Sequence, residues 1–364
     1  MVSILSGDIW DILSRIARKA EEESKIPAYP RTVLNVMAAS KLADDVFWLS
    51  RYAKEAFNLI VSIVKQLHKE GFVEFRDGGV KLTARGEDLL RRADYELINN
   101  ICDRCNGRRI TIDVLEEDVV KEFIKIQRDR PAPIREYDQG YVTPQTTLAR
   151  VAYMYHRGDL RGKDIIMLGD DDLVSIAIGL TGKARRVVVI DIDERLTRFI
   201  AKVSRDYGLG IEILRTDLRK PLPESIDRKF DVFQTDPLET IPGFRAFVGR
   251  GIATLRGPRC AGYFYITLID SSLDKWRAIQ RILVEEFRVV ITDIVQDFSE
   301  YINWGYFEEM HGWEILPEEL RITPRDGWYT STMFRIETLR GSKGFTEEIV
   351  DRKELYEDEE LASA

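Results

Sequence analysis

Aspartate residues follow four predicted strands of this 364-residue chain. The first strand is followed by three consecutive aspartates, and the next three by Asp191, Asp217 and Asp236. Because the carboxyl ends of parallel strands meet at one edge of a sheet, these side chains are expected to surround one ligand site. A carboxylate after the second strand can accept hydrogen bonds from both hydroxyls of a ribose. We therefore expect Asp191 to bind a ribose, and Asp217 to accept a hydrogen bond from an adenine amino group.

The loop after the first strand combines one glycine with the three aspartates. Nucleotide-binding sheets usually have several glycines here, which let the backbone approach a pyrophosphate. Gly169 is present, but Asp170, Asp171 and Asp172 would repel a pyrophosphate or the carboxylate of S-adenosylmethionine. Decarboxylated S-adenosylmethionine lacks that carboxylate and keeps a sulfonium and an ammonium group, so it suits this loop. A divalent-metal site and an N-cap cluster opening the next helix are the alternatives.

The carboxylates after the fourth strand suit an amine substrate. Asp236 is followed by Pro237 and Glu239, without the second proline and the aromatic residue that amino-methyltransferases have at this place. A carboxylate here can orient an amine and accept its proton. The neutral amine can then attack a carbon that is activated by a sulfonium.

Alternating strands and helices from residue 163 onward predict an α/β fold. The pattern indicates a parallel sheet with helices on both faces, a Rossmann-like domain of the methyltransferase and spermidine-synthase type. We assign residues 161–345 to this catalytic domain. Residues 346–364 form an acidic C-terminal tail that is expected to be solvated or mobile.

Residues 1–98 are predicted to form helices followed by one hairpin. The strands 72–75 and 80–82 flank an Asp-Gly-Gly turn, and Thr83 is a candidate N-cap for the next helix. This order resembles a winged helix. The segment contains 15 Lys and Arg residues and 15 Asp and Glu residues, without the positive excess that is typical of DNA-binding domains. A dimerisation or lid role is therefore favoured over DNA binding.

Residues 99–160 are a predicted connector with two features of note. Cys102 and Cys105 have the spacing of half a zinc site, but a tetrahedral site needs four ligands. A metal-free turn is favoured over a zinc ion shared between two copies of the chain. The polar and aromatic loop 137–144 is expected to line a site in the next domain.

Aromatic residues near predicted strand ends are compatible with a cationic substrate. Tyr265 lies on the fifth predicted strand, where alternation directs two of the three aromatics at 263–265 into the core. The segment 298–309 mixes aromatic and acidic residues and contains Glu300 and Trp304. It is predicted to be either a lid over the substrate or a plain surface loop.

Composition excludes several classes of protein. The net charge is −8 and 44% of the residues are hydrophobic, which argues against disorder and against avid binding of nucleic acid. No apolar run approaches the roughly 18–20 residues that span a bilayer, and the first residues lack the basic region of a secretory signal. Three cysteines are too few for a disulfide framework, so a cytoplasmic location is expected.

The segments around the aspartates resemble one family closely. The run Gly169–Asp172, followed by Leu-Val-Ser-Ile-Ala, together with "TDLRKPLPE", "FDVFQTDPLET", "RGIATL" and "AGYFYIT", resembles the branched-chain polyamine synthases of thermophiles, the N(4)-bis(aminopropyl)spermidine synthases. The resemblance extends over essentially the whole chain. It implies two aminopropyl transfers from decarboxylated S-adenosylmethionine to the central amine of spermidine, giving a quaternary ammonium and methylthioadenosine. It also implies a homodimer with an acidic active-site tunnel and no cofactor besides this co-substrate.

The resemblance also implies roles for individual residues. Asp171 or Asp172 would orient or deprotonate the amine, with Asp170 beside them. The remaining expected ligands of the donor and of the polyamine, with no metal ligand among them, are Gly169, Asp191, Asp217 and Leu218 for the donor, and Asp236, Glu239, Tyr265, Glu300 and Trp304 for the polyamine. Two other functions stay open: an S-adenosylmethionine-dependent N-methyltransferase, and a winged-helix regulator that senses a nucleoside or a polyamine.

Overall fold

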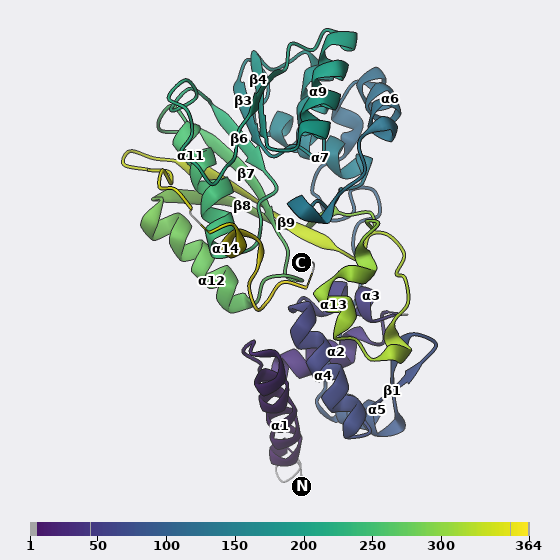
Figure 1. Cartoon of the computed structure of the whole chain (residues 1–364). Coiled ribbons are helices and arrows are strands. Elements are labelled where there is room, and N and C mark those ends of the chain that lie inside the picture. The colour runs from purple at the N-terminus through teal and green to yellow at the C-terminus, as the bar shows by residue number, and fades with distance from the viewer. Residues whose placement is uncertain (1–5, 44, 350, 363–364) are drawn as a thin grey trace.

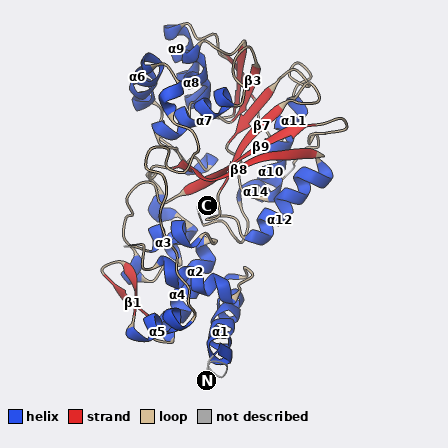
Figure 2. Cartoon of the chain, turned by 180° about the vertical axis from the view of Figure 1, so that it is seen from behind, coloured by secondary structure: helices blue, strands red, loops and turns tan. Residues whose placement is uncertain are grey.

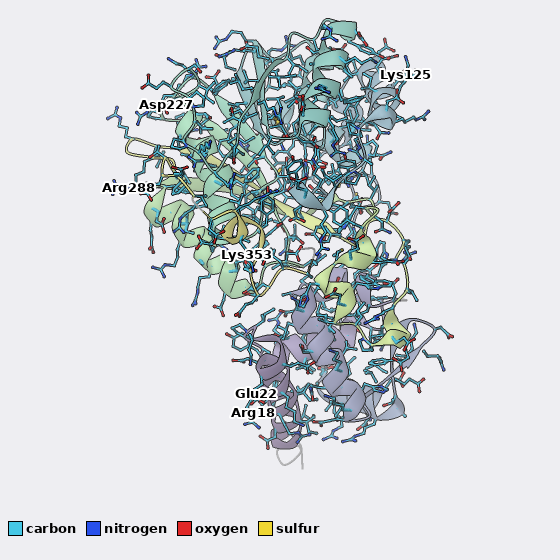
Figure 3. All side chains as sticks on the ribbon, in the orientation of Figure 1. Arg18, Glu22, Lys125, Asp227, Arg288 and Lys353 are labelled. Carbon is cyan, nitrogen blue, oxygen red and sulfur yellow. The ribbon has the colours of Figure 1, made fainter. Side chains whose placement is uncertain are left out.

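The chain forms a helical N-terminal part and a larger sheet-containing part, which lie at opposite ends of the molecule (Figure 1). The computed structural model describes residues 6–43, 45–349 and 351–362. None of the helices in these ranges is long and apolar enough to cross a membrane. Charged side chains of both signs cover the surface, among them the labelled Arg18, Glu22 and Lys125 (Figure 3).

Seven strands form one mixed sheet in the order β5-β4-β3-β6-β7-β9-β8 (Figure 2). Strands β3 to β7 are parallel to their neighbours, whereas β9 is antiparallel to both β7 and β8. The strands are β3 Asp164–Leu168, β4 Arg186–Asp191, β5 Glu212–Arg215, β6 Val232–Thr235, β7 Ala261–Ile266, β8 Val289–Glu300 and β9 Thr330–Thr338.

The predicted all-parallel sheet is therefore wrong at one edge, where the sequence analysis missed β9. All nine residues of β9 are buried although six of them are polar or charged, so the strand lacks an apolar pattern. Its buried charges are paired inside the protein, as in the ion pair of 2.9 Å between Arg335 and Asp159. Strand β8, beside it, spans 12 residues and ends at Glu300.

Side-chain alternation along the central strands builds two apolar layers. Ile165 and Met167 of β3 face one layer, while Ile166 and Leu168 face the other. Helices α6 to α9 cover the first layer, and α11 and α12 the second. These helices are α6 Glu117–Ile126, α7 Pro144–His156, α8 Val174–Thr181, α9 Glu194–Tyr207, α11 Arg250–Thr254 and α12 Leu273–Arg281.

The N-terminal part contains the helices and the hairpin that the sequence predicted. Its strands pair from Val73 with Leu82 to Arg76 with Gly79, and the Thr83 side chain accepts a hydrogen bond from the Gly86 N–H at the start of the last helix. The elements are α1 Ser6–Ser24, α2 Pro30–Ala39, α3 Val46–Ala53, α4 Phe57–Lys69, β1 Val73–Arg76, β2 Gly79–Leu82 and α5 Ala84–Arg92.

The segment between β8 and β9 packs into the core of this N-terminal part. Trp304, Phe307 and Trp328 are buried in one cluster with the helices α1 to α4. The Trp328 ring lies 4.9 Å from the Phe47 ring of α3, measured between centroids. The segment 298–309 is thus not the plain surface loop that was one of its two predicted forms, and its motion as a lid stays a prediction.

Part of the C-terminal tail is packed against the protein, although most of its described residues are exposed. Lys275 of α12 donates to the Asp358 carboxylate at 2.7 Å, and Thr240 donates to the Leu355 carbonyl at 2.7 Å. The short helices of this region are α10 Ile241–Phe244, α13 His311–Glu314 and α14 Arg352–Tyr356. Five of the seven residues 355–361 are nevertheless acidic or aromatic, so composition alone did not reveal this packing.

Truncation of Trp328 to Ala is expected to lower the free energy of unfolding by about 3–5 kcal/mol, as for other buried Trp and Phe residues. Trp328 is 1% exposed and joins the two parts of the molecule. Trp10→Ala is the matched control, because this residue is 50% exposed and a surface substitution usually changes the free energy of unfolding by no more than about 0.5 kcal/mol. Denaturant unfolding measures both, and equal losses in the two variants would contradict a shared core.

Candidate active site

One cavity lies at the carboxyl ends of the parallel strands and is lined by acidic and aromatic side chains. Its empty space, counted out into the open mouth, is about 1080 Å³. Among the described lining residues none is Lys or Arg, and six are carboxylic acids: Asp138, Asp171, Asp191, Asp217, Asp236 and Glu239. Such a lining attracts a cation.

The predicted nucleoside ligands lie together at one part of this cavity. Gly169, Asp191, Asp217 and Leu218 all line it. The two oxygens of Asp191 accept from the N–H groups of Asp193 at 2.8 Å and Asp170 at 3.1 Å. Burial raises the pKa of Asp191 to about 6, opposed by these two N–H groups. Each oxygen keeps a second lone pair that a ribose hydroxyl can use.

Asp217 lies in a different electrostatic environment from Asp191. Its carboxylate accepts from the Arg219 guanidinium, with the shortest distance 2.6 Å. Burial alone would raise the pKa of Asp217, but the hydrogen bonds from Arg219 outweigh it and the pKa is lowered. Asp217 is therefore held as a carboxylate with a fixed orientation.

The three aspartates after β3 have three different environments. Asp170 is buried and both of its oxygens accept from the Ser175 N–H at 3.2 Å, at the start of α8. Asp172 is buried and accepts from the Val142 N–H at 2.8 Å and from Arg150 at 2.6 Å. Asp171 lines the cavity. The structure thus brings only one carboxylate of the three to the ligand space among the residues it describes.

Burial and neighbouring acids both raise the pKa of Asp171. Burial raises the pKa of Asp171 well above its ordinary value, and the charges of Asp172, Asp236 and Asp191 raise it further. A positively charged ligand beside Asp171 would offset this repulsion and favour its ionised form.

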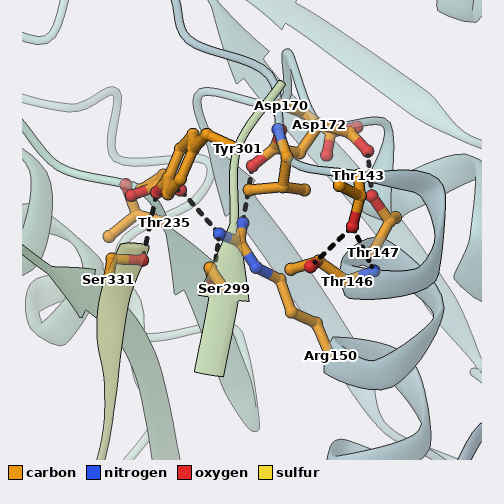
Figure 4. Close-up of polar contacts among 12 residues, drawn as sticks. Thr143, Thr146, Thr147, Arg150, Asp170, Asp172, Thr235, Ser299, Tyr301 and Ser331 are labelled. Carbon is orange, nitrogen blue, oxygen red and sulfur yellow. Dashed lines mark hydrogen bonds and ion pairs between the residues drawn. The ribbon is translucent and has the colours of Figure 1, made fainter. Parts of the chain in front are cut away.

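Arg150 is buried and contacts Asp172 and Ser299 (Figure 4), and it also forms an ion pair with Asp236. Arg150 of α7 donates to Asp236 at 2.7 Å, to Asp172 at 2.6 Å and to the Ser299 hydroxyl at 2.9 Å. The Tyr301 hydroxyl donates to the same Asp236 oxygen at 2.7 Å. Burial raises the pKa of Asp236 to about 6, and the charge of Arg150 opposes that rise.

A second group of acids lies at the Glu239 part of the cavity. Burial raises the pKa of Glu239 well above its ordinary value, and the charges of Asp270, Asp236 and Asp138 add to the effect. Burial and Asp270 likewise raise the pKa of Asp138 to about 7. Gln139 anchors the Asp138 loop, since its amide donates to Asp193 at 3.0 Å.

The aromatic lining comes from parts of the chain that are distant in sequence. The predicted site-lining loop supplies Tyr137, and the segment after β8 supplies Tyr301 and Trp304. Tyr329 precedes β9, and Tyr356 ends α14 of the C-terminal tail. Aromatic faces of this kind can bind the methylene chains and ammonium groups of a cationic substrate.

Two predicted polyamine ligands lie outside the cavity lining. Tyr265 is fully buried beneath Arg150, whose guanidinium carbon lies 3.6 Å from the centre of the ring. Glu300 is held by Arg51 and Arg108, each at 2.9 Å. Both residues therefore make contacts that stabilise the surrounding structure. Strand alternation and acidic character alone could not predict which way their side chains point.

No metal centre is visible in the ranges that the structure describes. There, no group of three or more His, Cys, Asp or Glu side chains is arranged to hold a metal ion. Cys102 is exposed, whereas Cys260 is buried elsewhere in the core.

Sequence reasoning missed Arg150, Tyr301 and Tyr356. Arg150 has a signal in hindsight, because it interrupts the apolar run 148–154 of a helix. Tyr301 lies inside the segment 298–309 that was considered, but nothing in its spacing indicates a hydrogen bond to Asp236. Tyr356 lies in a tail whose composition suggested exposure.

Comparison with known proteins places the chain in one family. Residues 118–363 match the model of the branched-chain polyamine synthase A C-terminal domain. The N(4)-bis(aminopropyl)spermidine synthase of Thermococcus kodakarensis is 50% identical over 96% of this chain and 100% of its own length. The protein of the same name from Methanocaldococcus jannaschii is 44% identical over 96% and 100%.

A solved structure matches nearly the entire chain. The C9 mutein of the branched-chain polyamine synthase from Thermus thermophilus, in complex with N4-aminopropylspermidine and 5'-methylthioadenosine, has a TM-score of 0.89 and 35% sequence identity, covering 98% of this chain and 99% of its own. With the family model and both relatives in agreement, the chain belongs to the branched-chain polyamine synthases.

Proposed function

We propose that this protein transfers aminopropyl groups from decarboxylated S-adenosylmethionine to the central amine of spermidine. The transfers give a branched polyamine with a quaternary ammonium and release methylthioadenosine. The observation that carries the proposal is the cavity with six carboxylic acids and no Lys or Arg among its described lining residues. Relatives that cover this chain almost completely bear the name of this activity, and the matching structure holds a product-like polyamine with methylthioadenosine.

The cavity favours the decarboxylated donor over S-adenosylmethionine. Both donors share the nucleoside that Asp191 and Asp217 are placed to bind. The amino-acid carboxylate of S-adenosylmethionine would face Asp171 without a cationic partner in the lining, whereas the aminopropyl ammonium of the decarboxylated donor is attracted there. This repulsion separates the proposal from the N-methyltransferase alternative.

The chemical step needs a neutral nitrogen next to the activated carbon. The nitrogen lone pair attacks the aminopropyl carbon that is bound to sulfur, the carbon–sulfur bond breaks, and its electrons neutralise the sulfonium. In the first transfer the new tertiary ammonium loses a proton, which Asp171 or Asp236 of the lining can accept. In the second transfer the nitrogen carries no proton, so orientation by these carboxylates is sufficient.

The N-terminal part has a structural role in this proposal. Its helices and hairpin follow the order of a winged helix, and its balanced charges favour contacts with protein over contacts with DNA. We therefore propose that it supports the cavity and a homodimer, in place of the regulator alternative. The free thiols of Cys102, Cys105 and Cys260 support a reducing, cytoplasmic location.

Mass spectrometry of the products tests the function directly. With spermidine and decarboxylated S-adenosylmethionine, the pure protein is expected to give products that are heavier by one and by two aminopropyl groups, with one methylthioadenosine released for each aminopropyl group transferred. Methylated products from S-adenosylmethionine would replace the proposal by the first alternative. Absence of product from either donor would favour a sensor.

The carboxylates after β3 are expected to differ in their effects on turnover and stability. Asp171→Asn should lower kcat by about 100-fold or more, the order of general acid–base effects, with little loss of stability because a repelled carboxylate is removed. Asp172→Asn should lower both kcat and the unfolding midpoint, because it breaks the buried pair with Arg150.

Asp206→Asn is the control for these variants, since this aspartate is exposed on α9 and does not line the cavity. Turnover assays and thermal unfolding on all three proteins separate chemistry from folding. A normal kcat in Asp171→Asn would remove this residue from the chemical step.

A further inference from the structure

We propose that Arg150 is a positioning residue, which fixes the orientation of Asp236 and keeps it ionised for the attack of the amine. The inference deepens the proposed aminopropyl transfer and rests on it. Arg150 itself does not line the cavity, so it acts through Asp236.

The guanidinium of Arg150 is fixed from four sides. It is fully buried and bridges the loop after β3 to the loop after β6 through Asp172 and Asp236. Ser299 of β8 accepts from the same nitrogen that binds Asp236, and the Tyr265 ring of β7 lies 3.6 Å from the guanidinium carbon. The guanidinium therefore has a fixed position, and the Asp236 carboxylate can keep its hydrogen bond to Arg150 in one orientation.

This arrangement selects one oxygen of Asp236 for the ligand. Arg150 and Tyr301 both donate to Oδ2, each at 2.7 Å. Since Asp236 also lines the cavity, Oδ1 is the oxygen that remains for an amine. Because two donors hold Oδ2, the direction of Oδ1 is also fixed. The direction of Oδ1 in turn sets the orientation of an amine nitrogen that is bound to it.

Arg150 is also the cation that acts on Asp236 within the described part of the chain. The groups that face Asp236 come from five elements, and all others are acids or phenols. They are Arg150 of α7, Asp171 and Asp172 after β3, Glu239 after β6, Tyr265 of β7 and Tyr301 after β8. Without Arg150, this environment favours a protonated Asp236, which cannot accept a proton from the amine.

Asp172 limits the effect of Arg150 on Asp236. Asp172 accepts a hydrogen bond from one nitrogen of the guanidinium and another from the Val142 N–H. If the charge of Asp172 were removed, Asp236 would be the one carboxylate left in the ion pair with Arg150. The two residues are therefore expected to move the ionisation of Asp236 in opposite directions.

The test is the pH dependence of aminopropyl transfer in three variants, each compared with the wild type on the same substrates. Arg150→Met should move the acidic limb of the pH profile of kcat/KM to higher pH by about one pH unit or more. The reason is that loss of a neighbouring opposite charge raises the pKa of a carboxyl group by about 1–3 units. Asp172→Asn should move that limb downward. The ionisation of the substrate amine is identical in every variant, so any difference belongs to the protein.

Arg150→Lys separates charge from geometry. A lysine keeps the positive charge but cannot bridge two carboxylates in a fixed plane. We expect its acidic limb to stay within about half a pH unit of the wild type, while kcat falls about 10-fold or more through misorientation. Arg198→Met is the control, because Arg198 is exposed on α9 and its loss should leave both limb and kcat unchanged.

The outcomes distinguish this inference from the proposed function. If the wild type forms no aminopropylated product, the proposed function fails. If the wild type is active and the acidic limb stays fixed in both Asp172→Asn and Arg150→Met, Arg150 has a structural role alone. If Arg150→Met does not fold, Tyr301→Phe replaces it, because this variant removes the second donor to Oδ2 and should move the acidic limb upward. Asp172→Asn should still move the limb downward, so these two opposite shifts decide the question.

Discussion

Repulsion among carboxylic acids around one cavity is the constraint on which the rest of this structure depends. Six acids face the cavity, and burial together with like charges raises the pKa of Asp171, Asp236 and Glu239. Such a group of acids is stable when some of its members are protonated or when cations are bound. Binding of a polyamine and ionisation of the site are therefore coupled, and fewer of these acids are ionised in the empty cavity than in the occupied one.

The fold distributes this repulsion over separate elements. The sheet edge supplies Asp171, Asp191 and Asp236, while Asp138 comes from a loop before the sheet. The aromatic wall depends on the N-terminal helices, because Trp304 and Tyr329 pack into their apolar cluster. The N-terminal part consequently contributes to the site without supplying any of the acids among the described lining residues.

The sequence predicts which strands and loops form this site better than it predicts the directions of their side chains. Strand ends are recognisable from periodicity, and with them Asp191, Asp217, Asp236 and Glu239 reach the cavity as expected. Residues whose roles depend on long-range contacts escape such analysis. Strand β9 was missed because its buried charges pair with distant partners. The contact of Glu300 with Arg51, 249 positions away in the chain, could not be predicted from local spacing either.

Successive transfer to one nitrogen explains why the site combines acids with aromatic rings. A secondary amine can donate a hydrogen bond to Asp236, whereas the quaternary product has no proton on that nitrogen. Attraction to the product must then come from charge and from ring faces such as Tyr301 and Trp304, neither of which needs a hydrogen. A site that relied on directional hydrogen bonds to the central nitrogen would lose its hold at the second transfer. A site that relies on buried negative charge and aromatic surface can bind this nitrogen as a secondary amine, as a tertiary amine and as a quaternary ammonium.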